Sequence, residues 1–193
     1  MTTIVATCSA NFVTLAADSG ITSDLIHPDM NKITTHGSWL VAVSGEDRVC
    51  DVLQYTVTYP KPPVTLLNQG TDAWLAWVVR KVVPAISAGI ESNLHKSYHS
   101  SLGDSQALLV THAKAFLISD TLGVTLADPY WSIGSGSHLA MGYLSSMMYA
   151  SDWHKNHDLI AKMAVESASI HDPYTRGKIS SYTSHHTGKI VPR

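Results

Sequence analysis

The chain begins with residues that combine a hydroxyl nucleophile and a potential N-terminal base. Removal of Met1 would leave Thr2 with both its Oγ and a free α-amino group. The ordinary pKa of an α-amino group is about 7.7–8.0, which suits a general base at neutral pH. Threonine with its own N-terminal amine is a known arrangement for nucleophilic catalysis. Because threonine is small, we expect methionine aminopeptidase to remove Met1, and Thr2 is then a candidate nucleophile.

Two charged residues follow at positions where they can support Thr2. Asp18 ends the apolar run 12–17, and Lys32 lies among residues typical of a strand. Taken alone, Asp18 is a turn residue and Lys32 a solvated surface side chain. Taken together, they form an ion pair, because a buried ammonium needs a counter-charge. A lysine beside Thr2 would also lower the pKa values of its hydroxyl and amine.

Two glycine-containing turns open predicted helices. Gly45 follows the apolar run 38–43, and its N–H can either form a strand-to-helix turn or bind a developing oxyanion. The run 133–137 contains Ser135 between two glycines, but it lacks the lysine of a P-loop and the spacing of a dinucleotide-binding motif. By itself this second turn indicates a helix cap.

Composition limits the classes of partner. The net charge of -2 and the lack of basic runs argue against nucleic acid binding. The 11 histidines are scattered without metal-ligand spacing, so we expect neither a metal nor a cofactor. Charged residues make up only 15% of the chain, against about 25% in typical domains. That deficit fits either large protein–protein contacts or a surface rich in Ser, Thr and His.

The sequence also predicts a cytoplasmic location. Cys8 and Cys50 do not form a disulfide framework, and we expect both to be small buried apolar residues in a reducing compartment. The N-terminus lacks the pattern of a secretory signal. The apolar stretches look too short and too interrupted to span a bilayer, so no membrane association is expected.

Hydrophobic periodicity predicts an α+β fold. The expected elements are strands 2–8, 12–17, 30–36 and 38–43, helices 46–59 and from 71 past 86, strands 106–111, 114–119 and 122–127, helices 136–150 and 157–170, and strands 178–184 and 188–192. Pro84 should kink or divide the second helix. Hairpins dominate and helices come in pairs, which favours two mainly antiparallel sheets packed face to face between helix layers. We expect one domain over 1–193, with a terminal hairpin and tail at 185–193.

The motifs together resemble the β-type subunits of the proteasome. The segments that carry the resemblance are Thr2-Thr3-Ile4-Val5, Ala17-Asp18-Ser19, Asn31-Lys32-Ile33, Ser44-Gly45, Ile133-Gly134-Ser135-Gly136-Ser137 and His171-Asp172-Pro173-Tyr174-Thr175. The start and Tyr182-Thr183-Ser184-His185 are also similar to the bacterial peptidase HslV. The resemblance implies the four-layer α-β-β-α fold of N-terminal nucleophile hydrolases. It further implies a threonine-type endopeptidase in a homo-oligomeric double ring, with polypeptide substrates and either an AAA+ unfoldase or another ring as partner.

The resemblance also assigns roles to residues. Thr2 would be the nucleophile, Asp18 and Lys32 its charged support, and Gly45 the oxyanion donor, with Ser135, Asp172 and Thr175 grouped around the Thr2 amine. The positions expected to line the first substrate pocket are Ile21, Met30, Thr34, Val43 and Asp47, and Thr22 and Gly45 would pair with the substrate backbone. This mixture suggests an apolar or small side chain at the cleavage site, unless these residues simply pack the domain.

The chain departs from the family pattern at three positions, and two other functions stay open. His171, Thr175 and Arg176 stand where arginine, serine and glycine are usual, and Arg176 puts the local backbone geometry in question. The same groups could serve an amidohydrolase that acts on a small amide. If Met1 is retained, the Thr2 nitrogen is an amide and the chain would be a non-catalytic ring or scaffold protein.

Overall fold

A computed structural model describes residues 2–20, 30–95, 101–147, 149 and 156–193 of the chain. It contains two five-stranded sheets in which all paired neighbours are antiparallel. The first sheet has the order β10-β9-β2-β1-β8, with β1 (Thr3–Cys8), β2 (Phe12–Asp18), β8 (Tyr130–Gly134), β9 (Ile179–His185) and β10 (Ile190–Pro192). The second has the order β3-β4-β5-β6-β7, with β3 (Ile33–His36), β4 (Trp39–Ser44), β5 (Gln106–Thr111), β6 (Lys114–Ile118) and β7 (Val124–Leu126).

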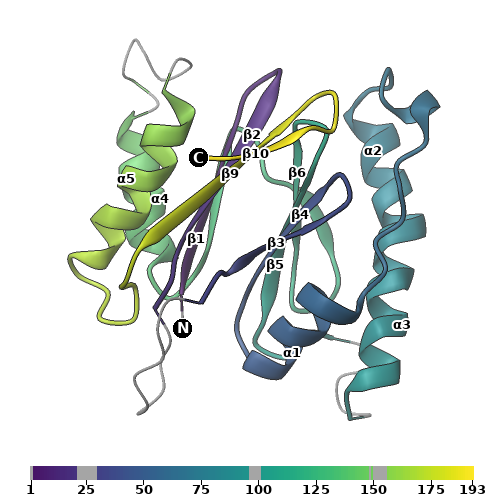
Figure 1. Cartoon of the computed structure of the whole chain (residues 1–193), viewed down its shortest axis with the longest axis horizontal. Helices are drawn as coiled ribbons and strands as arrows, with labels where there is room; N and C mark the ends of the chain where they lie inside the picture. Colours follow the sequence, from purple (N-terminus) through teal and green to yellow (C-terminus); the bar gives the residue numbers. More distant parts are fainter. Residues whose placement is uncertain (1, 21–29, 96–100, 148, 150–155) are drawn as a thin grey trace.

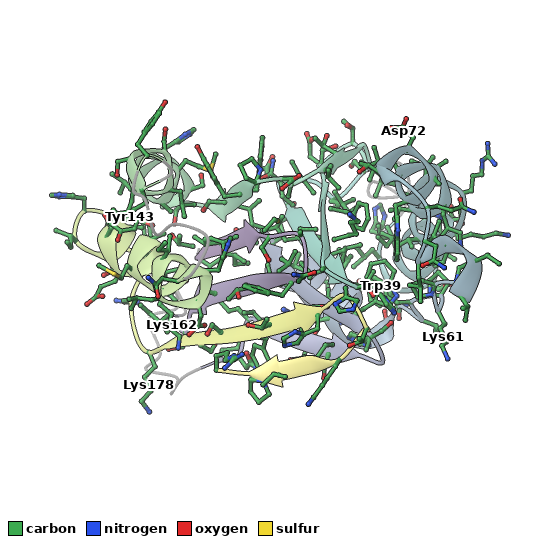
Figure 2. All side chains as sticks on the ribbon, turned by 90° about the horizontal axis from the view of Figure 1, so that it is seen from above. Trp39, Lys61, Asp72, Tyr143, Lys162 and Lys178 are labelled. Carbon is green, nitrogen blue, oxygen red and sulfur yellow. The ribbon has the colours of Figure 1, made fainter. Side chains whose placement is uncertain are left out.

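Helices cover the outer face of each sheet (Figures 1 and 2). The first sheet is covered by α4 (Ser137–Met147) and α5 (His157–Ser169). The second is covered by α1 (Asp47–Asp51), η1 (Val52–Thr56), η2 (Val64–Leu66), α2 (Thr71–Trp77), η3 (Val78–Val82) and α3 (Val83–Asn93). The fold is therefore the predicted four-layer α-β-β-α sandwich.

The central strands are buried on both faces, and this explains their continuous apolar sequences. Successive side chains of a strand point to opposite faces of the sheet. Ile4 of β1 thus packs between the sheets with Leu40 and Leu108, whereas the next residue, Val5, packs outward against Ala164 of α5. Each sheet contributes one side to the core between them, and their relative position is set by this apolar contact.

The long helix corrects the expectation that every apolar stretch is too short and too interrupted to span a bilayer. Residues Thr71–Asn93 form a helical segment of 23 residues that is long and apolar enough to cross a membrane by length and composition. Its apolar residues at four-residue spacing, Trp74, Val78, Val82, Ile86 and Ile90, are instead buried against the second sheet. The predicted division takes the form of the π-type segment η3, which ends two residues before Pro84, a residue that cannot donate a backbone hydrogen bond. Gly70, rather than a side-chain cap, precedes the helix.

The strand β8 was not predicted, and it matters for the site. It is short, follows Pro129 and ends in the glycine turn that the sequence indicates only as a helix start. In the fold it is the edge strand beside β1, with Thr3 paired to Gly134. This register places the turn between β8 and α4 next to Thr2.

Candidate active site

A buried carboxylate organises the site. Asp18 at the end of β2 is 0% exposed. Within the described residues it accepts five hydrogen bonds: to Oδ1 from Thr2 Oγ (2.6 Å) and the Thr3 N–H (2.8 Å), and to Oδ2 from Lys32 Nζ (2.9 Å), the Gly20 N–H (3.0 Å) and the Arg176 N–H (3.2 Å). The antiparallel pairing of β1 with β2 brings Thr2 and Asp18 together. The predicted charged support is therefore assembled in the structure.

Lys32 reaches this carboxylate from the other sheet. It lies just before β3, is 8% exposed, and pairs with Asp18. Burial lowers the pKa of Lys32 from its ordinary value, although the charge of Asp18 opposes that shift. The Gln54 amide donates a hydrogen bond to the backbone oxygen of Lys32 (2.8 Å) and anchors the lysine to η1. A lysine whose ammonium form is partly destabilised is suited to exchange protons beside a hydroxyl.

A second cluster forms beside the backbone of Thr2. Asp172 Oδ2 accepts hydrogen bonds from Ser135 Oγ and Thr175 Oγ, both at 2.6 Å, and Oδ1 accepts the Tyr174 N–H at 3.1 Å. Ser135 Oγ lies 3.4 Å from the Thr2 carbonyl oxygen. Burial acts to raise the pKa of Asp172, but these hydrogen bonds outweigh it and lower that pKa below its ordinary value. The three predicted residues are thus adjacent, and Ser135 connects them to Thr2.

Two of the three departures from the resembled pattern, Thr175 and Arg176, are accommodated locally. Thr175 keeps its hydroxyl in the cluster, is 2% exposed, and also contacts the Thr3 hydroxyl. Arg176 supplies its backbone N–H to Asp18. A Cβ at Gly20 would lie 2.5 Å from Arg176 Cγ, so the glycine leaves room for the larger side chain. Arg176, the residue that put the local backbone geometry in question, therefore contributes a hydrogen bond to the Asp18 carboxylate.

Gly45 borders the site at the end of β4. Its φ of +135° favours glycine, and a Cβ there would lie 2.3 Å from Ser105 Oγ. The same Ser105 oxygen accepts the Glu46 N–H at 2.9 Å, which fixes the turn before α1. Gly45 and Thr2 line one pocket, and the role of the Gly45 N–H as an oxyanion donor remains a prediction.

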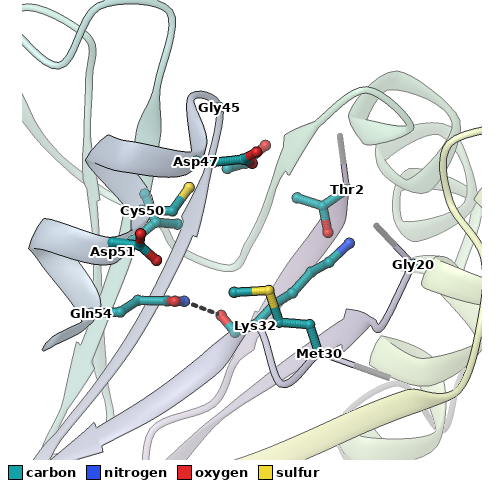
Figure 3. Close-up of a pocket in the computed structure, with 11 residues that line it drawn as sticks. Thr2, Gly20, Met30, Lys32, Gly45, Asp47, Cys50, Asp51 and Gln54 are labelled. Atoms are coloured by element: carbon teal, nitrogen blue, oxygen red, sulfur yellow. Dashed lines mark hydrogen bonds between the residues drawn. The ribbon is translucent and has the colours of Figure 1, made fainter. Parts of the chain in front are cut away.

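A pocket of about 240 Å³ opens beside Thr2 (Figure 3). Its lining includes the predicted residues Met30, Val43 and Asp47. Thr34 is not among the lining residues, and Ile21 and Thr22 lie outside the described part of the chain. The pocket thus combines the candidate nucleophile with three of the predicted substrate-binding side chains.

Three further lining residues were missed from the sequence: Cys50, Asp51 and Gln54. With Asp47 they follow helical spacing, and this was the signal that they share one face of the segment after Gly45. Cys8 is buried as predicted, but Cys50 is only partly buried in the pocket wall. Burial and the nearby charges of Asp47 and Asp51 raise the pKa of Cys50 to about 11, so its thiol stays protonated at neutral pH.

Gly134 offers a test of how tightly the site is packed. Its φ is +98°, and a Cβ would lie 1.9 Å from the Thr2 carbonyl oxygen. We expect Gly134→Ala to lower the free energy of unfolding by more than about 1 kcal/mol and to reduce any Thr2-dependent turnover. Chemical denaturation and rate measurements check this. Gly142→Ala is the control, because a Cβ there meets nothing within 4 Å in α4; an equal loss in both variants would contradict the packing argument.

Comparisons with known proteins support the fold. No protein-family model and no curated protein sequence matches the chain. Its structure is similar to that of Thiobacillus denitrificans BPH in complex with epoxomicin, with 16% identity and a TM-score of 0.72 over 95% of this chain and 98% of that chain. A second structure of Thiobacillus denitrificans BPH gives the same score and identity over 97% of that chain. At this identity the likeness shows the fold alone, an α-β-β-α sandwich over nearly the full length of both chains.

Proposed function

We propose that this chain is a threonine-type N-terminal nucleophile hydrolase that cleaves peptide bonds. The observation that carries the proposal is the hydrogen bond from Thr2 Oγ to the buried Asp18 carboxylate, which also holds the Lys32 ammonium, at the side of a pocket. A threonine that serves only to pack the fold does not require a buried ion pair beside its hydroxyl. Buried ion pairs are costly to form, and their presence beside a nucleophile indicates a functional site.

The proposed reaction starts when Thr2 is the first residue. Its α-amine accepts the proton of Oγ while Oγ forms a bond to the substrate carbonyl carbon. The Gly45 N–H binds the oxygen that becomes negative. The amine then returns the proton to the leaving nitrogen as the peptide bond breaks, and water releases the acyl group from Oγ by the same sequence. Asp18 and Lys32 hold Oγ in place and balance charge throughout.

We further propose that the chain works on polypeptides within a cytoplasmic homo-oligomeric double ring that receives them from an AAA+ unfoldase. The proposal follows from the motif resemblance. It is supported by exposed apolar side chains around α4 and α5, namely Leu139, Leu159, Met163, Ile170 and Tyr174. Exposed apolar groups that share one side of a domain are typical of protein–protein contacts.

Cleavage of a removable leader tests the function. The chain is produced with a protease-cleavable leader directly before Thr2, and hydrolysis of blocked fluorogenic peptides is measured before and after cleavage, with the N-terminus verified by intact mass. We expect turnover only after cleavage, because only then is the Thr2 nitrogen an amine. Epoxomicin, which Thiobacillus denitrificans BPH binds, should inhibit that turnover.

The uncleaved chain is the matched control, since it contains the same site with an amide at Thr2. Equal turnover before and after cleavage would contradict the N-terminal mechanism. Hydrolysis of small amides but not of peptides by the cleaved chain would identify an amidohydrolase. No turnover of either class, with a correctly processed N-terminus and intact assembly, would favour a scaffold protein.

A further inference from the structure

The pocket beside Thr2 has an acidic wall. Asp47 and Asp51 lie on α1, across the pocket from the nucleophile (Figure 3). Asp47 is exposed at the surface, and Asp51 is half-buried. Among the described residues, neither carboxylate forms a hydrogen bond or an ion pair. The other charged residue among the described lining residues is Lys32, whose charge is balanced by Asp18, so Asp47 and Asp51 leave this wall negative.

A buried amide oxygen adds to this wall. Gln54 lines the same pocket and is 2% exposed. Its Nε2 donates to the Lys32 backbone oxygen, and since a carbonyl can only accept, this bond fixes which end of the amide is the oxygen. Oε1 then has no hydrogen-bond partner within the described residues. A buried acceptor without a donor costs free energy, so this oxygen indicates a ligand that brings an N–H group.

We infer that this pocket binds an arginine side chain, and less tightly a lysine, on the amino-terminal side of the cleaved bond. The inference rests on the proposed function. Met30 and Val43 would contact the methylene stem, and the guanidinium would donate to Asp51 and Gln54 Oε1, with Asp47 at the entrance. Arginine has five N–H donors and no acceptor, which matches the two carboxylates and the amide oxygen of this wall.

An apolar side chain fits this pocket less well than the sequence suggested. It would gain contact with Met30 and Val43 but would remove water from Asp51 and Gln54 without replacing its hydrogen bonds. Sites built to hydrogen-bond a substrate group discriminate strongly against analogues that lack it. A glutamate at the same substrate position would face two carboxylates of like charge.

The test compares substrates that differ at one residue. Blocked fluorogenic peptides with Arg, Lys, Leu, Glu or citrulline before the fluorophore are assayed with the chain that begins at Thr2. We expect kcat/KM to fall from Arg to Lys and further to citrulline and Leu, with Arg at least about tenfold above Leu. In Asp51→Asn the Arg-to-Leu ratio should fall at least about tenfold. Asp72→Asn, the same charge change at an exposed site on α2, should leave the ratio unchanged.

The failure of this inference is separable from failure of the proposed function. If peptides are hydrolysed, a Leu preference, or an Arg-to-Leu ratio that Asp51→Asn leaves unchanged, overturns the inference alone. If no peptide is hydrolysed, the proposed function fails, and the pocket is tested by calorimetric binding of the Arg and Leu peptide amides to Thr2→Ala. Tighter binding of the Arg peptide that Asp51→Asn removes supports the inference; equal binding, a Leu preference or no binding overturns it.

Discussion

Thr2→Ala is expected to lower kcat for peptide hydrolysis by at least about 10⁴-fold, in line with the removal of nucleophiles in other hydrolases. Oγ is the atom that would bond to the substrate carbonyl, and no described hydroxyl other than that of Thr2 donates to Asp18. Thr2→Ser should keep measurable turnover, because it retains Oγ and the α-amine. Burst-phase and steady-state kinetics on fluorogenic peptides provide the measurement, and the assembled state is checked by sedimentation.

A matched control separates chemistry from stability. Thr14 on β2 is also fully buried, and its hydroxyl makes a side-chain hydrogen bond to Thr183 at 3.0 Å. Both Thr2→Ala and Thr14→Ala should lose about 1–3 kcal/mol of unfolding free energy. Turnover per folded molecule should collapse only in Thr2→Ala. Unchanged turnover in that variant would rule out Thr2 as the nucleophile.

Lys32→Met is expected to have the largest effect on stability. It leaves the buried Asp18 carboxylate without its ammonium partner, and breaking a buried pair in this way costs about 3–5 kcal/mol. Turnover should fall by at least about 10²-fold, because the group that balances charge beside Oγ is lost. Denaturant unfolding and peptide hydrolysis measure the two effects separately.

A double-mutant cycle isolates the pair. Asp18→Asn with Lys32→Met should destabilise by less than the sum of the single changes, since the double variant buries no uncompensated charge. The surface pair Asp158–Lys162, at 3.2 Å and four residues apart in α5, is the control and should couple by only about 0.3–0.5 kcal/mol. Equal coupling in the two pairs would show that Asp18 and Lys32 are not a desolvated ion pair.

The sequence was most informative where local pattern decides structure. The hairpins β1–β2 and β5–β6 follow from apolar runs separated by short turns, and the observed bounds agree with the predicted ones within two residues. The edge strand β8 was missed because Tyr130–Gly134 is short and pairs with a strand more than a hundred residues earlier. Tyr130–Gly134 forms a strand because it pairs with β1. Local periodicity does not reveal a pairing with a distant segment.

The candidate site shows the same contrast between features that local sequence reveals and features that only the fold decides. Thr2, Asp18 and Lys32 were recognised by type and spacing, and the structure brings them together. The contribution of the Arg176 N–H to Asp18 was missed, because a backbone donor 158 residues away leaves no mark in side-chain composition. Asp51 and Gln54 were missed for a related reason, since only the path of the chain after Gly45 decides that their helical face borders the pocket beside Thr2.

The division of the site between the two sheets has a mechanical consequence. Asp18 ends a strand of the first sheet and Thr2 directly precedes another, whereas Lys32 and Gly45 flank strands of the second. The two sheets meet through an apolar layer whose contacts are non-directional, so a small sliding movement of one sheet over the other would change the distance from Thr2 to the pocket wall. A molecule that binds one arrangement of the two sheets better than another would therefore shift the position of Thr2 relative to Lys32 and Gly45 without contacting Thr2.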